Sequence, residues 1–346
     1  MTGEESNKKK TISDLGEFGL IEYLTKNISL KHKSTVKGVG DDSAVMDYNN
    51  LQTLVTTDLM LEGIHFDLMY FPLKHLGYKS VIVNISDILA MNCLPSQIMV
   101  SIGISGRFNL ENVEEVYSGI KLACDKYNID LVGGDTTTSM TGLTISITAI
   151  GAARSDKIVY RSGAKKNDII CTTGDLGAAY MGLQLLEREK EVFNAHPGAQ
   201  PDLSGHDYIL ERQLKPEART DVIRFFEDND IIPTSMIDIS DGLASDLLHI
   251  CSNSSVGCKI FQDKIPIDNE TVKMADKFDI EPTTAALNGG QDYELLFTIS
   301  TEDYAKIENE TKIHPIGHIT DSEFGTYMIS YSDHEIELKA QGWSKE

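Results

Sequence analysis

The chain has 346 residues, a formal net charge of −22 and 41% hydrophobic residues. This length is enough for two domains that each bury a core, and the composition is that of a globular protein. The acidic excess argues against a nucleic-acid partner, because no basic stripe offsets it. No run of about 18 apolar residues is present, so no membrane partner is expected either.

The five cysteines are odd in number and form no Cys-x-x-Cys pair. Most of them lie in apolar or helical surroundings, so we expect buried free thiols rather than disulfides or zinc ligands. The polar N-terminus lacks the apolar core of a signal peptide. Together these features predict a reducing, cytoplasmic location.

Three regions are expected along the chain. Residues 1–12 are polar and partly basic and predict a disordered tail, followed by an N-terminal α+β domain over 13–152 and a C-terminal α+β domain over 153–346. In the first half the elements are expected in the order strand, helix, strand, helix, strand, strand. This order is an α+β pattern rather than a strict βαβ repeat.

The first acidic motif is the turn Gly40-Asp41-Asp42, and the strand after it ends in Thr56-Thr57-Asp58. Adjacent carboxylates repel each other unless a positive charge lies between them. Oxygen ligands of this kind suit Mg²⁺, whose coordination is completed by water and substrate phosphates. A solvated turn ahead of a strand is the alternative for this stretch alone.

Apolar residues recur from Leu76 to Met91 and predict a helix that carries Asp87. An unpaired charge would be unfavourable among neighbours such as Ile88 and Leu89. Asp87 is therefore expected to meet a cation, unless it lies on the polar side of the helix.

Alternation from Ile98 to Ile104 predicts a strand, and helical spacing predicts a helix from Asn109 to Tyr127. A short strand, Ile129 to Val132, is expected to end at Gly133-Gly134-Asp135. Paired glycines expose backbone N–H groups beside a carboxylate, which can serve a phosphate together with its metal. A plain hairpin turn is the alternative.

In the second half, a strand from Ile169 to Thr173 leads through Gly174 into a helix from Ala178 to Glu189. This connection resembles a phosphate-cradling loop, but it lacks the P-loop spacing, and a tight turn is the better account. Further helices are expected at 208–214, 218–227, 271–278 and 302–309, and further strands at 256–261, 314–319, 326–331 and 335–338.

Two later motifs carry more carboxylates and glycines. Asp238 and Asp241 are three residues apart and would face the same way on a helix. The segment around Asp241 repeats five of six positions of the segment around Asp87, although helix N-caps often carry Ser and Asp. Gly289-Gly290-Gln291 again places a glycine pair ahead of a strand.

The acidic residues share a position beside Gly, Ser or Thr at the edge of an element. No Ser–His–Asp, His-Glu-x-x-His, Cys-x-x-Cys or Gly-x-Gly-x-x-Gly motif competes with them. Carboxylates in this number fit a site that assembles several Mg²⁺ ions around a polyphosphate. The set is Asp41, Asp42, Asp58, Asp87, Asp135, Asp238 and Asp241.

The ordered set of motifs resembles the thiamine-monophosphate kinase family, in the superfamily of aminoimidazole ribonucleotide synthetase. The resemblance runs from about Gly16 to Trp343, and the order of the motifs is more specific than any one of them. The matching segments are Gly40-Asp41-Asp42, Thr56-Thr57-Asp58, Glu62-Gly63-Ile64-His65-Phe66, Asn84-Ile85-Ser86-Asp87, Gly133-Gly134-Asp135-Thr136, Arg161-Ser162-Gly163-Ala164, Asp238-Ile239-Ser240-Asp241-Gly242-Leu243 and Gly289-Gly290-Gln291-Asp292-Tyr293-Glu294-Leu295.

The resemblance implies a two-domain α+β fold of the aminoimidazole ribonucleotide synthetase type, and a homodimer whose N-terminal sheets pair into a barrel. It also implies ATP-dependent phosphorylation of thiamine monophosphate to thiamine diphosphate, with ATP held by several Mg²⁺ ions. The implied metal ligands are Asp42, Thr56, Thr57, Asp58, Asp87, Asp135, Asp238 and Asp241. The implied ATP contacts are Tyr117, Gly134, Asp135, Arg161 and Ser240, and the implied contacts to thiamine monophosphate are His65, Gln291 and Trp343. The implied catalytic group is Asp42, Asp87, Asp135, Asp241 and Arg161.

At one position the chain departs from the family pattern, which has glutamate where this chain has Gln291. An amide still hydrogen-bonds an aminopyrimidine but brings no charge to a cationic thiazolium. The departure therefore bears on substrate affinity more than on the type of reaction.

Two other functions remain as alternatives. A sister enzyme of the superfamily would use similar aspartates with a different acceptor; selenophosphate synthesis, for example, would call for a reactive cysteine near the N-terminus, whereas the first one here is Cys93. A non-catalytic acidic metal-binding module would not consume ATP in a manner that depends on thiamine monophosphate.

Overall fold

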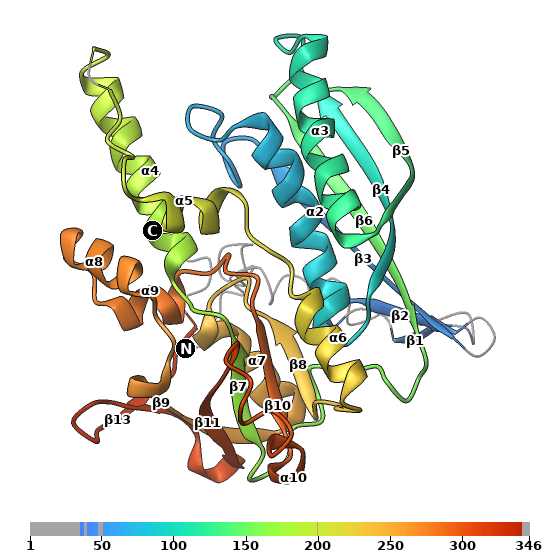
Figure 1. Ribbon diagram of the computed structural model, residues 1–346, viewed down its shortest axis with the longest axis vertical. Helices are drawn as coiled ribbons and strands as arrows, with labels where there is room; N and C mark the ends of the chain where they lie inside the picture. The colour runs from blue at the N-terminus through green and yellow to red at the C-terminus, as the bar shows by residue number, and fades with distance from the viewer. Residues whose placement is uncertain (1–34, 38–39, 48–50, 199, 341–346) are drawn as a thin grey trace, which may run out of the picture.

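A computed structural model describes residues 35–37, 40–47, 51–198 and 200–340. The first half forms a six-stranded mixed sheet in the order β1-β2-β3-β6-β4-β5, in which only β4 and β5 are parallel neighbours. Helices α2 and α3 lie side by side against one face of this sheet (Figure 1). The elements are β1 (Thr35–Lys37), β2 (Ala44–Asp47), β3 (Gln52–Leu61), α2 (Leu73–Ala90), β4 (Pro95–Ile104), α3 (Leu110–Tyr127), β5 (Asp130–Thr138) and β6 (Thr144–Ala153).

The second half forms a seven-stranded sheet in the order β13-β12-β9-β11-β7-β10-β8. Helix α7 packs against β8, β9, β10 and α9, and α9 together with α4, α5 and α8 forms a group of neighbouring helices. The strands are β7 (Ile169–Thr173), β8 (Ser235–Asp238), β9 (Val256–Phe261), β10 (Leu295–Ile299), β11 (Ile313–Asp321), β12 (Thr326–Ile329) and β13 (Glu335–Glu337). The helices are α4 (Ala178–Ala195), α5 (Asp207–Leu214), α6 (Thr220–Asp228), α7 (Leu243–Ser254), α8 (Asn269–Lys277), α9 (Pro282–Asn288) and α10 (Thr301–Tyr304).

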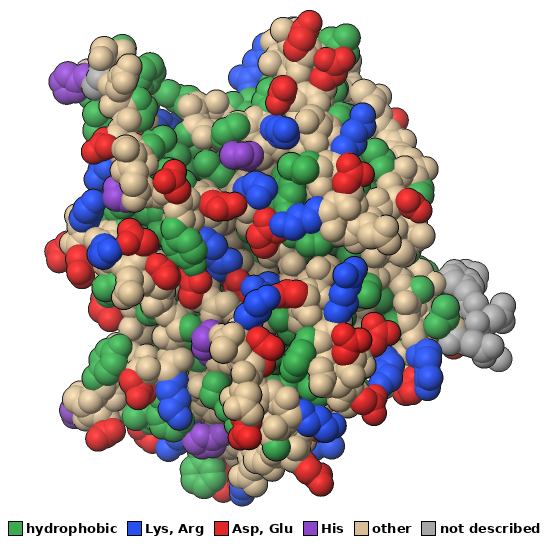
Figure 2. Space-filling model, viewed as in Figure 1, with side chains coloured by type: hydrophobic (Ala, Val, Ile, Leu, Met, Phe, Trp, Pro, Cys, Tyr) green, Lys and Arg blue, Asp and Glu red, His purple; other side chains and the backbone are tan. Residues whose placement is uncertain are grey.

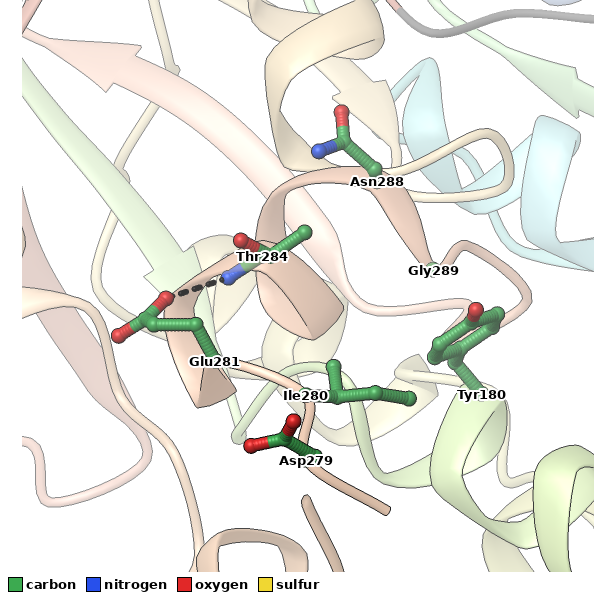
Figure 3. A pocket seen from close by; sticks show the side chains of 7 residues that line it. All are labelled: Tyr180, Asp279, Ile280, Glu281, Thr284, Asn288 and Gly289. Atoms are coloured by element: carbon green, nitrogen blue, oxygen red, sulfur yellow. Dashed lines mark hydrogen bonds between the residues drawn. The ribbon is translucent and has the colours of Figure 1, made fainter. Parts of the chain in front are cut away.

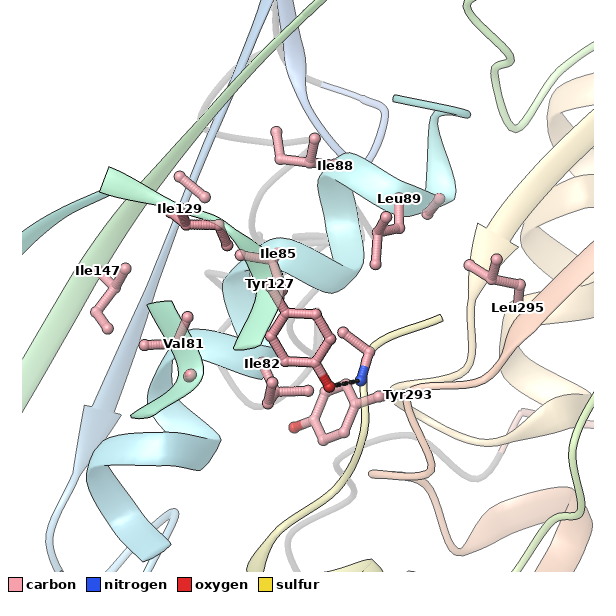
Figure 4. Packing of buried hydrophobic residues seen from close by; sticks show 14 of the residues in the cluster. Val81, Ile82, Ile85, Ile88, Leu89, Tyr127, Ile129, Ile147, Tyr293 and Leu295 are labelled. Atoms are coloured by element: carbon pink, nitrogen blue, oxygen red, sulfur yellow. Dashed lines mark hydrogen bonds between the residues drawn. The ribbon is translucent and has the colours of Figure 1, made fainter. Parts of the chain in front are cut away.

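One hydrophobic core runs through both halves of the chain. Ile82, Ile85 and Leu89 of α2 belong to the same buried cluster as Tyr293 and Leu295 of the second half (Figure 4). Burial of this apolar surface holds α2 between the first sheet and β8, which it contacts directly. The division into domains near residue 153 stays a prediction, and the core does not stop there.

Elements with a strong local pattern are confirmed. The strands at 169–173 and 256–261 have the predicted ends, and the predicted helix from Asn109 begins as α3 with Asn109 as its N-cap. The Asn109 side chain accepts from the backbone N–H of Asn112, whose side chain accepts from the N–H of Asn109, so the end of the helix is closed by a reciprocal pair of hydrogen bonds.

Several local predictions are wrong. The helix expected to end at Glu189 continues as α4 to Ala195, and the strand expected to end at Thr56-Thr57-Asp58 continues as β3 to Leu61. The strand expected to end before Gly133 continues as β5 to Thr138, because it pairs in parallel with β4 over its whole length. Asp238 ends strand β8 instead of sharing a helix with Asp241. The helix expected at 302–309 is limited to α10 at Thr301–Tyr304. The short pieces β8 and α9 lack a periodic signal of their own and were not predicted.

All five cysteines are free and buried, as predicted. Among the described residues, no helix has the length and apolar character needed to cross a membrane. Lysine and arginine side chains lie among aspartates and glutamates on the face shown in Figure 2. Positive and negative side chains are mixed there, so this face shows no broad positive surface.

Candidate active site

Three carboxylates from distant parts of the chain meet between the two halves. They come from the turn before β2 (Asp42), from α2 (Asp87) and from the end of β8 (Asp238), and one oxygen of each lies within 4.8 Å of the other two. Asp42 and Asp238 are buried, and Asp87 is half-buried. We call these three residues the acid cluster.

Burial and mutual repulsion disfavour the charged form of the carboxylates in the acid cluster. Burial, followed by the charge of Asp42, raises the pKa of Asp238 to about 7. Burial, followed by the charges of Asp238 and Asp58, raises the pKa of Asp87 well above its ordinary value. A divalent cation between these oxygens would remove the repulsion, and an all-oxygen donor set is the one that Mg²⁺ prefers. The residues present therefore fit a Mg²⁺ site.

Neighbouring polar groups hold the acid cluster in place. Thr56 Oγ1 donates to Asp87 Oδ2 at 2.6 Å, and Ser86 Oγ donates to Asp238 Oδ2 at 2.6 Å. The buried Asn84 accepts at Oδ1 from the backbone N–H of Asp58 at 2.8 Å, which ties β3 to α2. Roles for Asn84 and Ser86 were not predicted, although both belong to the Asn84-Ile85-Ser86-Asp87 motif.

Arg161 forms a two-pronged ion pair with Asp42. Its Nε lies 2.8 Å from Asp42 Oδ2 and its Nη2 lies 2.8 Å from Asp42 Oδ1. The backbone N–H of Arg161 donates to Asp41 Oδ1 at 3.3 Å. A bidentate pair of this kind fixes the guanidinium in direction as well as in distance. The contact of Arg161 with ATP stays a prediction.

Asp241 lies in the turn between β8 and α7 and is exposed. The backbone N–H groups of Asp241 and Gly242 both donate to Asp246 Oδ2 at 3.2 Å. Asp246 is buried, and burial followed by the charge of Asp241 raises its pKa well above the ordinary value. Asp246 therefore shapes this turn; sequence reasoning missed it, although it lies five residues after Asp241 in the same motif.

The loop of the last glycine motif is bound to the Asp238–Asp241 turn. The N–H of Gln291 donates to the carbonyl of Ser240 at 2.8 Å, and the N–H of Tyr293 donates to the carbonyl of Ile239 at 2.9 Å. Gly290 has φ +66°, and a Cβ there would lie 2.5 Å from the Ser240 oxygen, so the close approach requires glycine. This contact brings Gln291 to the turn that follows the acid cluster.

A cavity of about 390 Å³ adjoins the same glycine loop. Figure 3 shows the Tyr180 ring and the Ile280 side chain at this cavity, whereas the Glu281 carboxylate turns to the backbone N–H of Thr284 at 2.9 Å. The acid cluster does not line it; Gly289 does, one residue before Gly290. The cavity therefore lies beside the loop and offers an aromatic and an apolar surface.

Two predicted metal ligands lie apart from the acid cluster in this chain. Thr57 Oγ1 donates to the carbonyl of Ile147 at 3.0 Å, on the opposite face of the sheet from Thr56. Asp135 is exposed on the edge strand β5, opposite Ser101. Gly134 precedes it with φ +152° and touches the backbone of Val100. The structure thus groups Asp42, Thr56, Asp58, Asp87 and Asp238, and leaves Thr57 and Asp135 outside that group.

The remaining predicted contacts are scattered. Tyr117 lines a cavity with Lys74 at the far end of α2 from Asp87, about 20 Å away at ~1.5 Å per residue. His65 is exposed, and its Nδ1 accepts from the backbone N–H of Leu61 at 2.9 Å, so the neutral ring carries its proton on Nε2. Trp343 lies outside the described residues.

Comparison with known proteins gives a consistent result. The family described as AIR synthase related protein, N-terminal domain, matches residues 40–153. The thiamine-monophosphate kinase of Aquifex aeolicus is 33% identical and covers 87% of this chain and 92% of its own length. The enzyme of the same name from Buchnera aphidicola subsp. Schizaphis graminum is 36% identical over 96% of this chain and 99% of its own.

A solved structure of AaThiL complexed with AMPPCP and TMP is similar to this chain with a TM-score of 0.81 and 32% identity, over 96% of this chain and 98% of that one. The mixed α/β fold with two sheets is therefore that of the AIR synthase related proteins. Because relatives above 30% identity extend over nearly the whole length of the sequence, the chain belongs to the thiamine-monophosphate kinase family.

Proposed function

We propose that this chain transfers the γ-phosphoryl group of ATP to thiamine monophosphate and so forms thiamine diphosphate and ADP. The observation that carries the proposal is the acid cluster, whose three carboxylates meet within 4.8 Å beside the guanidinium of Arg161. Family membership and the complex of AaThiL with AMPPCP and TMP support the choice of substrates.

The chemistry needs no general base. A phosphate monoester has a second pKa of about 6 and is mostly dianionic at pH 7. One of its oxygens attacks the γ-phosphorus of ATP in line, a new P–O bond forms, the bond from the γ-phosphorus to the β,γ-bridging oxygen breaks, and ADP leaves with that electron pair. The barrier to overcome is the repulsion between two anionic phosphates.

The residues of this chain address that repulsion by position and charge. Asp42, Asp87 and Asp238 would hold Mg²⁺, with Asp58 and the hydroxyl of Thr56 beside them. Bound Mg²⁺ supplies positive charge to the phosphate oxygens. Arg161 is fixed by its two contacts to Asp42 and adds a guanidinium, which binds phosphate oxygens in the same forked geometry as a carboxylate.

The other predicted contacts complete the proposal. Thr57 and Asp135 would form a second ligand group for Mg²⁺ on the other face of the sheet, and Asp241 would contribute from the turn before α7. Tyr117, Gly134 and Ser240 are proposed to contact ATP, although the position of Tyr117 at the far end of α2 gives its role the least support. His65, Gln291 and Trp343 are proposed to contact thiamine monophosphate.

We also propose a homodimer in which the first sheets of two chains face each other as a barrel. Helices α2 and α3 cover one face of this sheet, and the other face carries the partly exposed Leu59 and Met99, at 49% and 38%. Apolar side chains on an uncovered sheet face are typical of an interface. A cytoplasmic location stays a prediction.

The deciding experiment is an assay for thiamine diphosphate formed from ATP and thiamine monophosphate, with and without Mg²⁺. Product that requires all three components is expected. ATP consumption that is indifferent to thiamine monophosphate would contradict the proposal, and a metal-binding module would show no ATP consumption at all.

A further inference from the structure

Lys79 is a buried lysine of α2 whose amino group lies between the two halves of the chain. Lys79 is only 1% exposed. Nζ donates to the backbone carbonyl of Gln213 on α5 at 2.7 Å and to Oε1 of Gln291 at 2.7 Å. Burying an amino group is unfavourable unless its N–H groups donate hydrogen bonds. Breaking either bond would leave a buried donor without an acceptor, so Lys79 holds both acceptors in place.

The contact with Lys79 determines which end of the Gln291 amide faces inward. Burial lowers the pKa of Lys79 to about 7, but its amino group keeps N–H donors whether it is protonated or neutral. The atom 2.7 Å from Nζ is the amide oxygen of Gln291, which accepts from that group. Gln291 keeps part of its surface accessible, and none of the described residues accepts a hydrogen bond from its Nε2. The accessible end of this side chain is therefore the N–H donor.

The backbone of Gln291 is fixed as well. Its φ is +60°, and its N–H donates to the carbonyl of Ser240, in the turn that follows Asp238. The ring centroids of Phe71 and Tyr293 lie 5.7 Å and 5.9 Å from Lys79 Nζ, which leaves the amino group little freedom to move. Among the described residues, the Nε2 end of Gln291 is thus left without a fixed partner.

We propose that Lys79 is a positioning residue that makes Gln291 a hydrogen-bond donor toward the substrate, so that position 291 selects an acceptor atom on the pyrimidine ring. This inference rests on the proposed function, in which Gln291 contacts thiamine monophosphate. A glutamate at the same position would offer only oxygens and would select a donor such as the pyrimidine amino group. In the 4-oxo form the ring nitrogen beside the carbonyl carries a proton, so the carbonyl oxygen is the acceptor offered to Nε2, and the site would accordingly tolerate this substrate.

The test compares kcat/KM for thiamine monophosphate with kcat/KM for its 4-oxo analogue, in which the pyrimidine amino group is a carbonyl. The measured quantity is the ratio of oxo to amino substrate. In Gln291→Glu this ratio should fall at least about tenfold, because carboxylate and carbonyl oxygens would oppose each other. In Lys79→Met the freed amide can turn, and the ratio should fall about three- to tenfold.

The double variant separates positioning from general support of the fold. Both ends of a carboxylate are oxygens, so its orientation is irrelevant, and Lys79→Met should leave the ratio unchanged in the Gln291→Glu background. Equal effects of Lys79→Met in both backgrounds would show a merely structural role and overturn the proposal.

Lys190→Met is the matched control. Lys190 also joins the two halves, through Asp67 at 2.8 Å and Glu187 at 2.9 Å, but does not contact Gln291. Its ratio should equal that of the wild type, and a fall like that of Lys79→Met would overturn the proposal. If Lys79→Met does not fold, as judged by its melting curve, Gln291→Glu decides alone, and an unchanged ratio there overturns the proposal.

The wild-type assay separates the two levels of inference. A wild type that forms no thiamine diphosphate refutes the proposed function and this role with it. An active wild type whose ratio is unaffected by Gln291→Glu and Lys79→Met refutes only the role of Lys79.

Discussion

Asp238 is a buried carboxylate whose neighbours are other carboxylates. Ser86 donates to it, but burial and the charge of Asp42 keep its pKa raised. Such a residue weakens the metal-free fold and strengthens metal binding, because the same repulsion that destabilises the empty site is relieved by a cation.

We expect Asp238→Asn to lower kcat at least about a hundredfold, because it removes one charged ligand from the acid cluster. The asparagine has the same shape and can still accept from Ser86, so the melting temperature without Mg²⁺ should stay equal to or above that of the wild type. The rise in melting temperature on adding Mg²⁺ should shrink. Asp228→Asn, at an exposed position of α6, is the control; a near-normal kcat for Asp238→Asn would contradict the metal assignment.

Gly134 lies at a position that has no room for a side chain. Its φ is +152°, and a Cβ would lie 1.8 Å from the carbonyl oxygen of Val100 on β4. Gly134→Ala should therefore lower the free energy of unfolding by roughly 2–4 kcal/mol, seen as a lower urea midpoint. Gly133→Ala is a close control, because its Cβ would meet only Met99 Cγ at 3.9 Å. Equal losses for both variants would show that Gly134 is not the strained position.

At the scale of elements, α2 carries several of the contacts that join the two halves. Lys79 contacts Gln291 and Ser86 contacts Asp238 in the second half, whereas Asn84 contacts β3 in the first half. One helix therefore orients both the acid cluster and the loop that carries Gln291. These polar residues are buried in a segment whose sequence is mainly apolar. The apolar spacing made the helix predictable, but it carried no information about what the polar residues contact.

The meeting of α2, β8 and the first acidic turn makes the stability of the metal-free protein depend on pH. The folded state holds the proton of Asp238 up to about pH 7, whereas the unfolded state loses it near 3.8. A raised carboxylate pKa contributes stability that is complete below the unfolded value and is lost as the pH rises through the folded value.

Relative to Asp238→Asn, the wild type without Mg²⁺ should thus lose stability as the pH rises from about 4 to 7, by up to about 4 kcal/mol. Melting temperatures of both proteins across this range measure the difference. A difference that does not change with pH would mean that the pKa of Asp238 is not raised in the folded protein. With saturating Mg²⁺ the difference at pH 8 should reverse, because the metal displaces the proton.

At the scale of the whole molecule, the elements of the described residues cover the first sheet on one side only. The pairing register puts Thr57, Thr148 and Met99 in one row and Leu59, Ser146 and Ser101 in the next, all on the face away from α2. A mixture of hydroxyls and apolar side chains on such a face fits the proposed dimer barrel better than a solvent-exposed surface of a monomer.

Leu59→Glu should convert the proposed dimer into a monomer, because it places a charge in each copy of the interface. Light scattering after size-exclusion chromatography would report the halved mass. Leu110→Glu, at an exposed position of α3, should keep the wild-type mass. A wild type that already runs as a monomer would refute the barrel.

The sequence by itself determined the local structure and the chemical character of this protein. Helix α3 with its Asn109 cap, strands β7 and β9, the buried free thiols and the oxygen-rich motifs follow from periodicity, capping and residue type, which act over a few neighbouring residues. The ordered motifs also identified the family.

Only the tertiary structure decided which of these residues meet. Thr56 and Thr57 are adjacent in sequence, yet they point to opposite faces of a strand, and Lys79 meets Gln291 across 212 positions. Such contacts depend on strand register and on packing of the shared core between elements far apart in the chain. No local pattern carries that information, because the energy that selects these contacts exists only once the two halves are folded together.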